Sequence, residues 1–138
     1  MRLTDHTDYA MRVLMYLGAH HDRLATTDQV ATLHGISHNH LTKVVNQLGR
    51  AGFVQTVRGR AGGIRLARPA CEIMVGDVVR CTEPDLHVVG CLGGEPSTCP
   101  LAGSCCLKRV FRAATFSFLD VLDRVPLSSL VEPAGAAA

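Results

Sequence analysis

The sequence predicts a mostly α-helical fold with a small β-hairpin, in which a winged helix-turn-helix domain is joined to a long dimerisation helix. Two short helical patterns meet at a glycine, a hairpin pattern follows them, and one long amphipathic pattern lies near the C-terminus. We expect a winged helix-turn-helix domain at 1–68, a linker helix and cysteine loop at 69–104, a dimerisation helix and C-terminal turn at 105–132, and a flexible tail at 133–138.

The first two helical patterns have recognisable ends. Residues 4–20 carry apolar side chains at helical spacing, with Thr4 as the expected N-cap. The second pattern opens on a capping box formed by Thr26 and Gln29 and stops at Gly35, which suits a helix C-terminus. The residues that these two helices should bury are Ala10, Val13, Leu14, Leu17, Val30 and Leu33.

A third helix and a hairpin complete the winged-helix order. The helix opens on Ser37 and ends at Gly52. The segment "FVQTV" at 53–57 is β-branched and aromatic, "RGRAGG" forms a turn, and "IRL" at 64–66 is a second short strand. The residues that the third helix should bury are Leu41, Val44, Val45 and Leu48.

Polar residues at the start of the third helix and in the wing are candidates for DNA contact. Asn39 could pair with adenine, Lys43 could reach a guanine or a phosphate, and Arg58 and Arg60 could enter a minor groove. An ordinary solvated helix face would look similar residue by residue. The complete set of expected DNA-binding residues is Thr27, Ser37, His38, Asn39, His40, Lys43, Arg58, Arg60 and Arg65.

The charge distribution agrees with DNA contact by the front half alone. Residues 1–68 carry nine Lys/Arg and four Asp/Glu, which gives +5. Residues 69–138 carry five and eight, which gives −3, and the two parts sum to the chain's +2. A basic front half and an acidic back half indicate that only the front meets a polyanion, although small domains often carry such an excess by chance.

The back half predicts a short helix, an irregular segment and a long helix. "VGDVVRCTE" is the short helix, residues 85–104 are irregular, and the long pattern runs from Cys105 until Pro126 ends it. An apolar stripe of this length needs a partner, and the simplest partner is the same helix of a second copy; the alternative is packing on its own domain. The stripe consists of Leu107, Phe111, Ala114, Phe118 and Val121.

Three cysteines, Cys91, Cys99 and Cys105, stand at C-x7-C-x5-C spacing among glycines and prolines that let three thiolates converge. This spacing predicts a soft-metal or redox site and names no metal. Cys105 starts a helix, where the dipole favours a thiolate. A fourth ligand is missing, because the adjacent Cys106 would point elsewhere. Cys71 and Cys81 are expected to be buried small hydrophobes.

Other features narrow the possibilities. His34, His38 and His40 are spaced poorly for a zinc site, because neighbours two apart on a helix face different ways. Asp5, Asp8 and Arg12 interrupt any signal peptide, and no segment is apolar enough to span a membrane. We therefore expect a cytoplasmic protein with reduced thiols.

The segments "MRLTDHTDYAMRVLMYLG", "HGISHNHLTKVVNQLGRAGFVQTVRGRAGG" and "FLDVLDRVPLSSLV", with the three cysteines, resemble the Rrf2 family of bacterial winged-helix regulators over nearly the whole chain. The chain is most similar to the family's nitric-oxide-sensing repressors. That resemblance implies a [4Fe-4S] cluster on Cys91, Cys99 and Cys105, with Asp8 of the other subunit as fourth ligand and Arg12 beside it.

The resemblance implies a homodimeric repressor that binds a palindromic double-stranded DNA operator and releases it when nitric oxide nitrosylates the cluster. One alternative is a [2Fe-2S] regulator of the same family, whose ligand histidine three residues after the third cysteine is replaced here by Lys108. A second alternative is a thiol-based redox-sensing repressor. An enzyme is not expected, since no substrate pocket, nucleotide-binding loop or activated nucleophile is evident.

Overall fold

The computed structural model describes residues 2–94 and 98–131, and it confirms the mostly helical fold with a small hairpin. The helices are α1 (Asp5–Ala19), α2 (Thr27–His34), α3 (His38–Arg50), α4 (Val75–Thr82) and α5 (Cys106–Asp123), and the strands are β1 (Val54–Val57) and β2 (Gly63–Leu66). Three short 3-10 turns are η1 (Ala70–Glu72), η2 (Gly90–Leu92) and η3 (Leu127–Ser129). The predicted tail at 133–138 lies outside the described residues.

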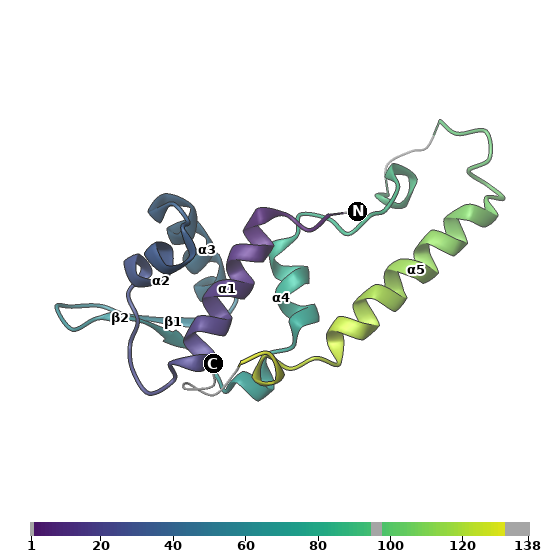
Figure 1. The fold of residues 1–138 in the computed structure, drawn as a ribbon. Coiled ribbons are helices and arrows are strands. Elements are labelled where there is room, and N and C mark those ends of the chain that lie inside the picture. The colour runs from purple at the N-terminus through teal and green to yellow at the C-terminus, as the bar shows by residue number, and fades with distance from the viewer. Residues whose placement is uncertain (1, 95–97, 132–138) are drawn as a thin grey trace.

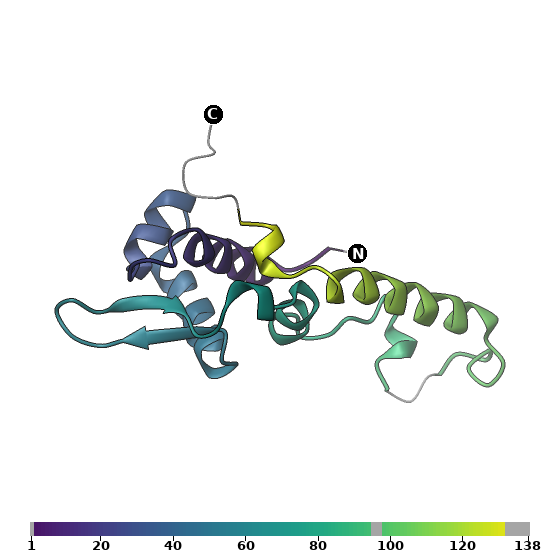
Figure 2. The same cartoon turned by 90° about the horizontal axis from the view of Figure 1, so that it is seen from below.

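Figures 1 and 2 show two parts: a head built from α1 to α4 with the hairpin, and α5, which extends away from the head. The loop that carries the cysteines lies at the outer end of α5 (Figure 1). No helix among the described residues is long and apolar enough to cross a membrane.

The predicted N-caps of α1, α2 and α3 are confirmed, and each is held by a local side-chain hydrogen bond. The Thr26 hydroxyl accepts from the Gln29 backbone N–H at 3.1 Å, and the Gln29 side chain accepts from the Thr26 N–H at 2.9 Å. Gly35 adopts φ 63°, the left-handed conformation of a helix C-cap. Thr4 and Ser37 cap α1 and α3.

The head is held together by one apolar core under α1, α2, α3 and the hairpin. Every predicted core residue of α1 and α3 is buried. The expectation for Leu33 is wrong: its side chain is 64% exposed, because the short helix α2 turns Val30 and Ala31 inward and Leu33 lies outside that face. The largest fully buried side chains of the core are Leu14, Leu17, Leu41, Leu48, Ile73 and Leu127.

The wing is an antiparallel hairpin with Gln55 opposite Arg65. The segment before α2 extends this sheet, because Ala25 and Ile64 exchange backbone hydrogen bonds of 3.0 and 2.7 Å. A Cβ at Gly63 would lie 2.5 Å from the Ala25 carbonyl oxygen, so a glycine is required for this close approach. The sheet therefore ties the wing directly to the entrance of the helix-turn-helix.

A hydrogen-bonded cluster joins the start of α1 to the end of α4. The Glu83 carboxylate accepts from the Thr4 backbone N–H at 2.8 Å and from the hydroxyl groups of Thr4 and Thr7. The Thr7 and Thr82 hydroxyls lie 2.8 Å apart, and the Thr82 hydroxyl donates to the Val78 carbonyl at 2.9 Å. We call Thr4, Thr7, Thr82 and Glu83 the threonine–glutamate cluster.

The cluster also determines the ionisation of Glu83. Partial burial raises its pKa, but the hydrogen bonds from Thr7 and Thr4 outweigh burial and hold the pKa below the ordinary glutamate value. The ionised form therefore strengthens the connection between α1 and α4.

Helix α5 contacts the head mainly at its C-terminal end. Arg80 of α4 donates two hydrogen bonds to the Asp123 carboxylate at 2.5 and 2.7 Å, and the Leu127 N–H donates to the Ile73 carbonyl at 2.8 Å. No residue of α5 is buried within this single chain. The large apolar side chains of α5 that are most exposed are Leu107 (58%), Val110 (61%), Phe116 (67%) and Val121 (62%).

We predict that Glu83→Gln lowers the free energy of unfolding at neutral pH by about 1–2 kcal/mol, because hydrogen bonds to a charged acceptor are lost. Since the folded-state pKa is lowered, the contribution of Glu83 is complete above the ordinary glutamate range and disappears as the pH falls through the lower folded-state value. Urea unfolding of the parent and the variant, at several pH values from neutral to acidic, measures this difference in the free energy of unfolding. Glu72→Gln, at an exposed residue, is the control; a destabilisation by Glu83→Gln that did not change with pH would contradict the prediction.

Candidate functional site

The start of α3 presents the polar surface that the sequence predicts. Asn39, His40 and Lys43 are exposed on its first turns. Ser37 is exposed as well, but its hydroxyl accepts from the His40 backbone N–H at 3.3 Å and is therefore partly engaged as the helix cap. This surface can donate to and accept from base edges, which is what a recognition helix needs.

His38 has a partner that sequence reasoning missed. Its Nδ1 lies 2.6 Å from an oxygen of Asp28 on α2, so the two helices of the helix-turn-helix are linked by this contact. The Thr42 hydroxyl donates to the His38 carbonyl oxygen at 2.8 Å. A role for His38 in stabilising the motif therefore stands beside the predicted DNA contact.

The wing presents its cations outward. Arg58 and Arg60 are exposed on either side of Gly59, whose φ of 114° bends the loop. Arg65 lies on the exposed face of β2 and donates to the Gln55 side chain at 3.0 Å. Thr27, at the start of α2, is half-buried.

The three cysteines of the predicted site lie on one loop. Cys91 is in η2 and half-buried, Cys99 is exposed, and Cys105 is the half-buried N-cap residue of α5. Among residues 2–94 and 98–131, no three His, Cys, Asp or Glu side chains are positioned to hold a metal ion. The donor chemistry fits a soft iron–sulfur core, whereas the described geometry does not close a site around one.

The remaining cysteines differ from one another. Cys106 is the exposed first residue of α5, and the Arg109 guanidinium donates to its sulfur at 3.3 Å. Cys71 is exposed, so the expectation that it is buried is wrong; it lies in η1, a surface turn with no buried residue. Cys81 is half-buried and packs against the core, and burial raises the pKa of its thiol.

The predicted fourth ligand, Asp8, lies on α1 in the head. Both side chains of the Asp8–Arg12 pair are about half exposed, and Arg12 donates to the Asp8 carboxylate at 2.9 Å. Burial and the charge of Arg12 lower the pKa of His34 on α2, while Asp8 raises it, so this pair acts electrostatically on the helix-turn-helix. The structure brings Asp8 and Arg12 together as an ion pair, but not with the described cysteines of the same chain.

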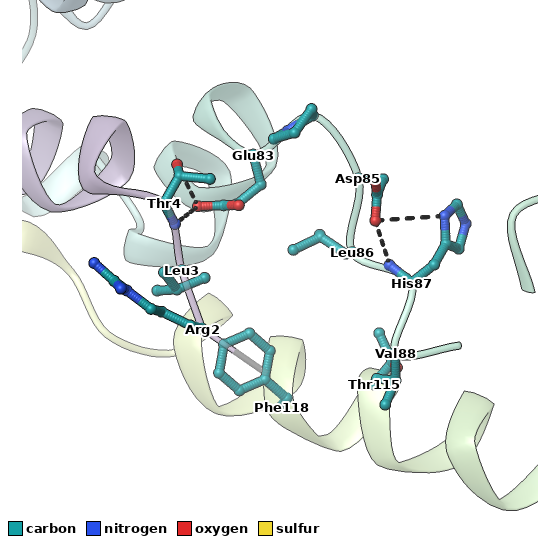
Figure 3. A pocket seen from close by; sticks show the side chains of 11 residues that line it. Arg2, Leu3, Thr4, Glu83, Asp85, Leu86, His87, Val88, Thr115 and Phe118 are labelled. Carbon is teal, nitrogen blue, oxygen red and sulfur yellow. Dashed lines mark hydrogen bonds and ion pairs between the residues drawn. The ribbon is translucent and has the colours of Figure 1, made fainter. Parts of the chain in front are cut away.

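A cavity of about 260 Å³ separates the start of α1 from the segment that leads to Cys91. Figure 3 shows Thr4 and Glu83 joined on one side of it, and Asp85 and His87 joined on the other. Phe118 and Thr115 of α5 complete its lining. The path from the head to the cysteine loop thus begins at the threonine–glutamate cluster.

Comparison with known proteins identifies the family. A family model described as Rrf2, an iron-dependent transcriptional regulator, matches residues 3–133. The HTH-type transcriptional regulator NsrR of Halalkalibacterium halodurans is 46% identical over 132 residues, which cover 95% of this chain and 90% of the relative. NsrR of Bacillus subtilis is 43% identical over 133 residues, which cover 96% of this chain and 91% of that protein.

Solved structures agree with this assignment. The oxidised form of Staphylococcus aureus CymR superposes with a TM-score of 0.76 at 26% identity and covers 96% of this chain and 97% of its own. IscR of T. potens superposes with a TM-score of 0.77 at 25% identity and covers 100% of this chain and 93% of its own. As expected, the sequence relatives are transcriptional regulators rather than enzymes. The chain belongs to the Rrf2 family of transcriptional regulators and is similar to NsrR.

Proposed function

We propose that this regulator is a homodimeric DNA-binding repressor whose [4Fe-4S] cluster senses nitric oxide. Cys91, Cys99 and Cys105 hold the cluster together with the partner subunit's Asp8. Nitric oxide then causes release of a palindromic operator. The observation that carries the proposal is that the three cysteines share one segment between α4 and α5. Cys91 lies in η2, Cys105 is the N-cap of α5, and the start of the segment is joined to α1 through Glu83.

The donor set supports a cluster with a labile ligand. Three thiolates suit iron–sulfur chemistry, and a carboxylate is a harder and weaker ligand for such a core. When bound, this group supplies reactivity toward a small diatomic gas. Lys108 stands where the [2Fe-2S] alternative would require histidine, and its ammonium cannot act as a neutral ligand.

The arrangement of α1 supports a ligand supplied across a dimer. Figures 1 and 2 place α1 in the head and the cysteine loop at the far end of α5. The Asp8 carboxylate is accessible, and Arg12 neutralises it when it is not a ligand. The partner subunit's Asp8 can therefore alternate between two positive partners.

The uncovered apolar face of α5 supports the dimer itself. Leu107, Val110, Ala114 and Val121 lie within about a quarter-turn of one another around the helix, and all four are exposed in the single chain. A face of this kind is costly in water and is covered by a second copy at low cost. A two-fold dimer also presents two recognition helices to a palindromic site.

The chain's own residues connect the cysteine loop to the DNA-reading surface. One end of the loop leads back to Glu83, which is hydrogen-bonded to the start of α1. The other end continues into α5, which Asp123 joins to Arg80 of α4. A change in the loop therefore reaches α1 and α4 by two routes, and α1 packs directly on α3 in the common core.

A thiol-based sensor is the second candidate. The exposure of Cys106 and its 3.3 Å contact with the Arg109 guanidinium favour it, because an oxidant in solution can reach this sulfur. A thiol count before and after oxidant treatment of iron-free protein separates this candidate from the cluster sensor.

We predict that anaerobically purified protein is brown with the absorbance of a [4Fe-4S] cluster, and that nitric oxide bleaches this absorbance. We also predict that the Asp8→Ala variant keeps the fold but loses iron to a chelator at least about tenfold faster than the parent. Asp5→Ala removes another exposed carboxylate of α1 and is the matched control. Visible absorbance and circular dichroism measure both effects. Colourless parent protein with stoichiometric zinc would contradict the cluster, and an Asp8→Ala variant that kept its iron as the parent does would remove Asp8 from the site.

We predict that Arg60→Ala weakens operator binding and reduces by about two the slope of log K against log salt, because each of the two subunits loses one cationic contact with DNA. Fluorescence anisotropy over a salt series measures the slope. Arg124→Ala, which removes a cation at the end of α5, should leave it unchanged. Equal slopes in Arg60→Ala and the parent would exclude the wing from the contact.

We predict that Val121→Glu weakens dimerisation at least about 100-fold, because two unpaired charges would be buried in the symmetric interface. Sedimentation velocity over a concentration series measures the dissociation constant. Ser128→Glu adds the same charge in η3, outside α5, and should remain dimeric. A Val121→Glu protein that dimerised as tightly as the parent would show that this face is not the interface.

A further inference from the structure

The N-terminal end of α5 borders a cavity of about 390 Å³ with a cationic lining. The cavity is lined by Lys108, Arg109 and Arg112 of the helix, together with Cys105 and residues 102–104. No Asp or Glu among the described residues lines it. We call these three side chains the cationic cradle.

Among the residues that the structure describes, the cradle cations have no carboxylate partner, whereas the other two cations of the back half do. Arg80 contacts Asp123 at 2.5 Å, and Arg124 contacts Asp120 at 2.7 Å. Within the described part of the chain, Lys108, Arg109 and Arg112 form no ion pair. Carboxylates are not scarce, since residues 69–138 carry eight Asp/Glu and five Lys/Arg. The unpaired charges are therefore concentrated at one place.

Their position opposes the helix dipole. Helices α1, α2 and α4 carry acidic residues in their first turns, as the positive end of a helix favours, whereas α3 does not. Helix α5 has no acidic residue there and instead places Lys108 and Arg109 near its start. Cations at this end destabilise the isolated helix, and an anion bound between them removes that penalty.

We propose that the cationic cradle binds the net negative charge of the cluster and its ligands, and thereby retains the cluster. The inference rests on the proposed function. Three thiolates and the partner subunit's carboxylate together exceed the positive charge of an iron–sulfur core, so the liganded assembly is an anion. The cradle is already within reach of sulfur, because the Arg109 guanidinium lies 3.3 Å from the Cys106 sulfur.

DNA is a poorer occupant of the cradle. Figures 1 and 2 place the outer end of α5 far from α3 and the wing, which carry the DNA-reading side chains. A duplex bound to α3 and the wing of one chain would therefore not pass over the cradle of that same chain. A small anionic assembly held by the adjacent cysteines needs no such reach.

The first test uses metal-free, reduced, full-length protein. Iodoacetate and iodoacetamide alkylate the same thiolate, so the ratio of their rate constants at Cys105 and Cys106 reports the local potential independently of thiol ionisation. Replacing Lys108, Arg109 and Arg112 by Gln should lower the ratio of the iodoacetate to the iodoacetamide rate constant at least about threefold. Added salt should reduce this difference between the variant and the parent. Replacing Arg23, Arg50 and Arg124 by Gln removes the same net charge elsewhere and should leave the ratio unchanged. An unchanged ratio in the cradle variant would overturn the cradle; Cys71 in η1 is the internal reference.

The second test uses the anaerobic iron-loaded protein and follows transfer of iron to a chelator by visible absorbance. The cradle variant should lose its cluster at least about fivefold faster than the parent and the charge-matched control. Equal rates of loss, or a defect confined to operator affinity, would overturn a role toward the cluster. A parent protein that takes up no iron would contradict the proposed function itself, and the alkylation ratio would still decide whether the cradle exists.

Discussion

The hydrogen bonds that Glu83 accepts from Thr4 and Thr7 connect the two halves of this molecule. They join residues 79 and 76 positions apart, at the point where the last helix of the head gives way to the cysteine loop. Because the carboxylate is ionised and partly buried, the connection is stronger than a surface contact and depends on the exact placement of both helices. Anything that displaces residues 83–89 must either break these hydrogen bonds or move the start of α1.

The second constraint is the exposed length of α5. One end is tied to α4 through Asp123 and Leu127, and no residue along the helix is buried in the single chain. The outer end instead carries thiols and cations that form no ion pair within residues 2–94 and 98–131. Helix α5 thus has an apolar face along its length, and thiols and positive charge at its outer end. This combination fits the sensor that we propose, in which one helix serves dimerisation, cluster retention and signal transmission.

Local features of the fold follow directly from the sequence, whereas distant contacts do not. Thr4, Thr26 and Ser37 each accept from a backbone N–H three residues away, so their capping roles are visible in the sequence. The Asp28–His38 contact and the Glu83 hydrogen bonds join separate elements, and no periodicity predicts them. The prediction that Cys71 and Leu33 are buried is wrong, because apolar neighbours in the sequence do not determine which face of a short turn or helix points inward. Similarly, the cysteine spacing predicts the donors, while convergence of the three thiolates would depend on the cluster that we propose they bind.

Amide hydrogen exchange of the cluster-loaded dimer, before and after nitric oxide, tests most directly whether the loop acts on the head through Glu83. The account predicts faster exchange in the cysteine loop, in residues 83–89 and in the first turn of α1, together with loss of operator affinity. Loss of operator affinity with exchange changes confined to residues 91–106, and with the first turn of α1 unaltered, would contradict it.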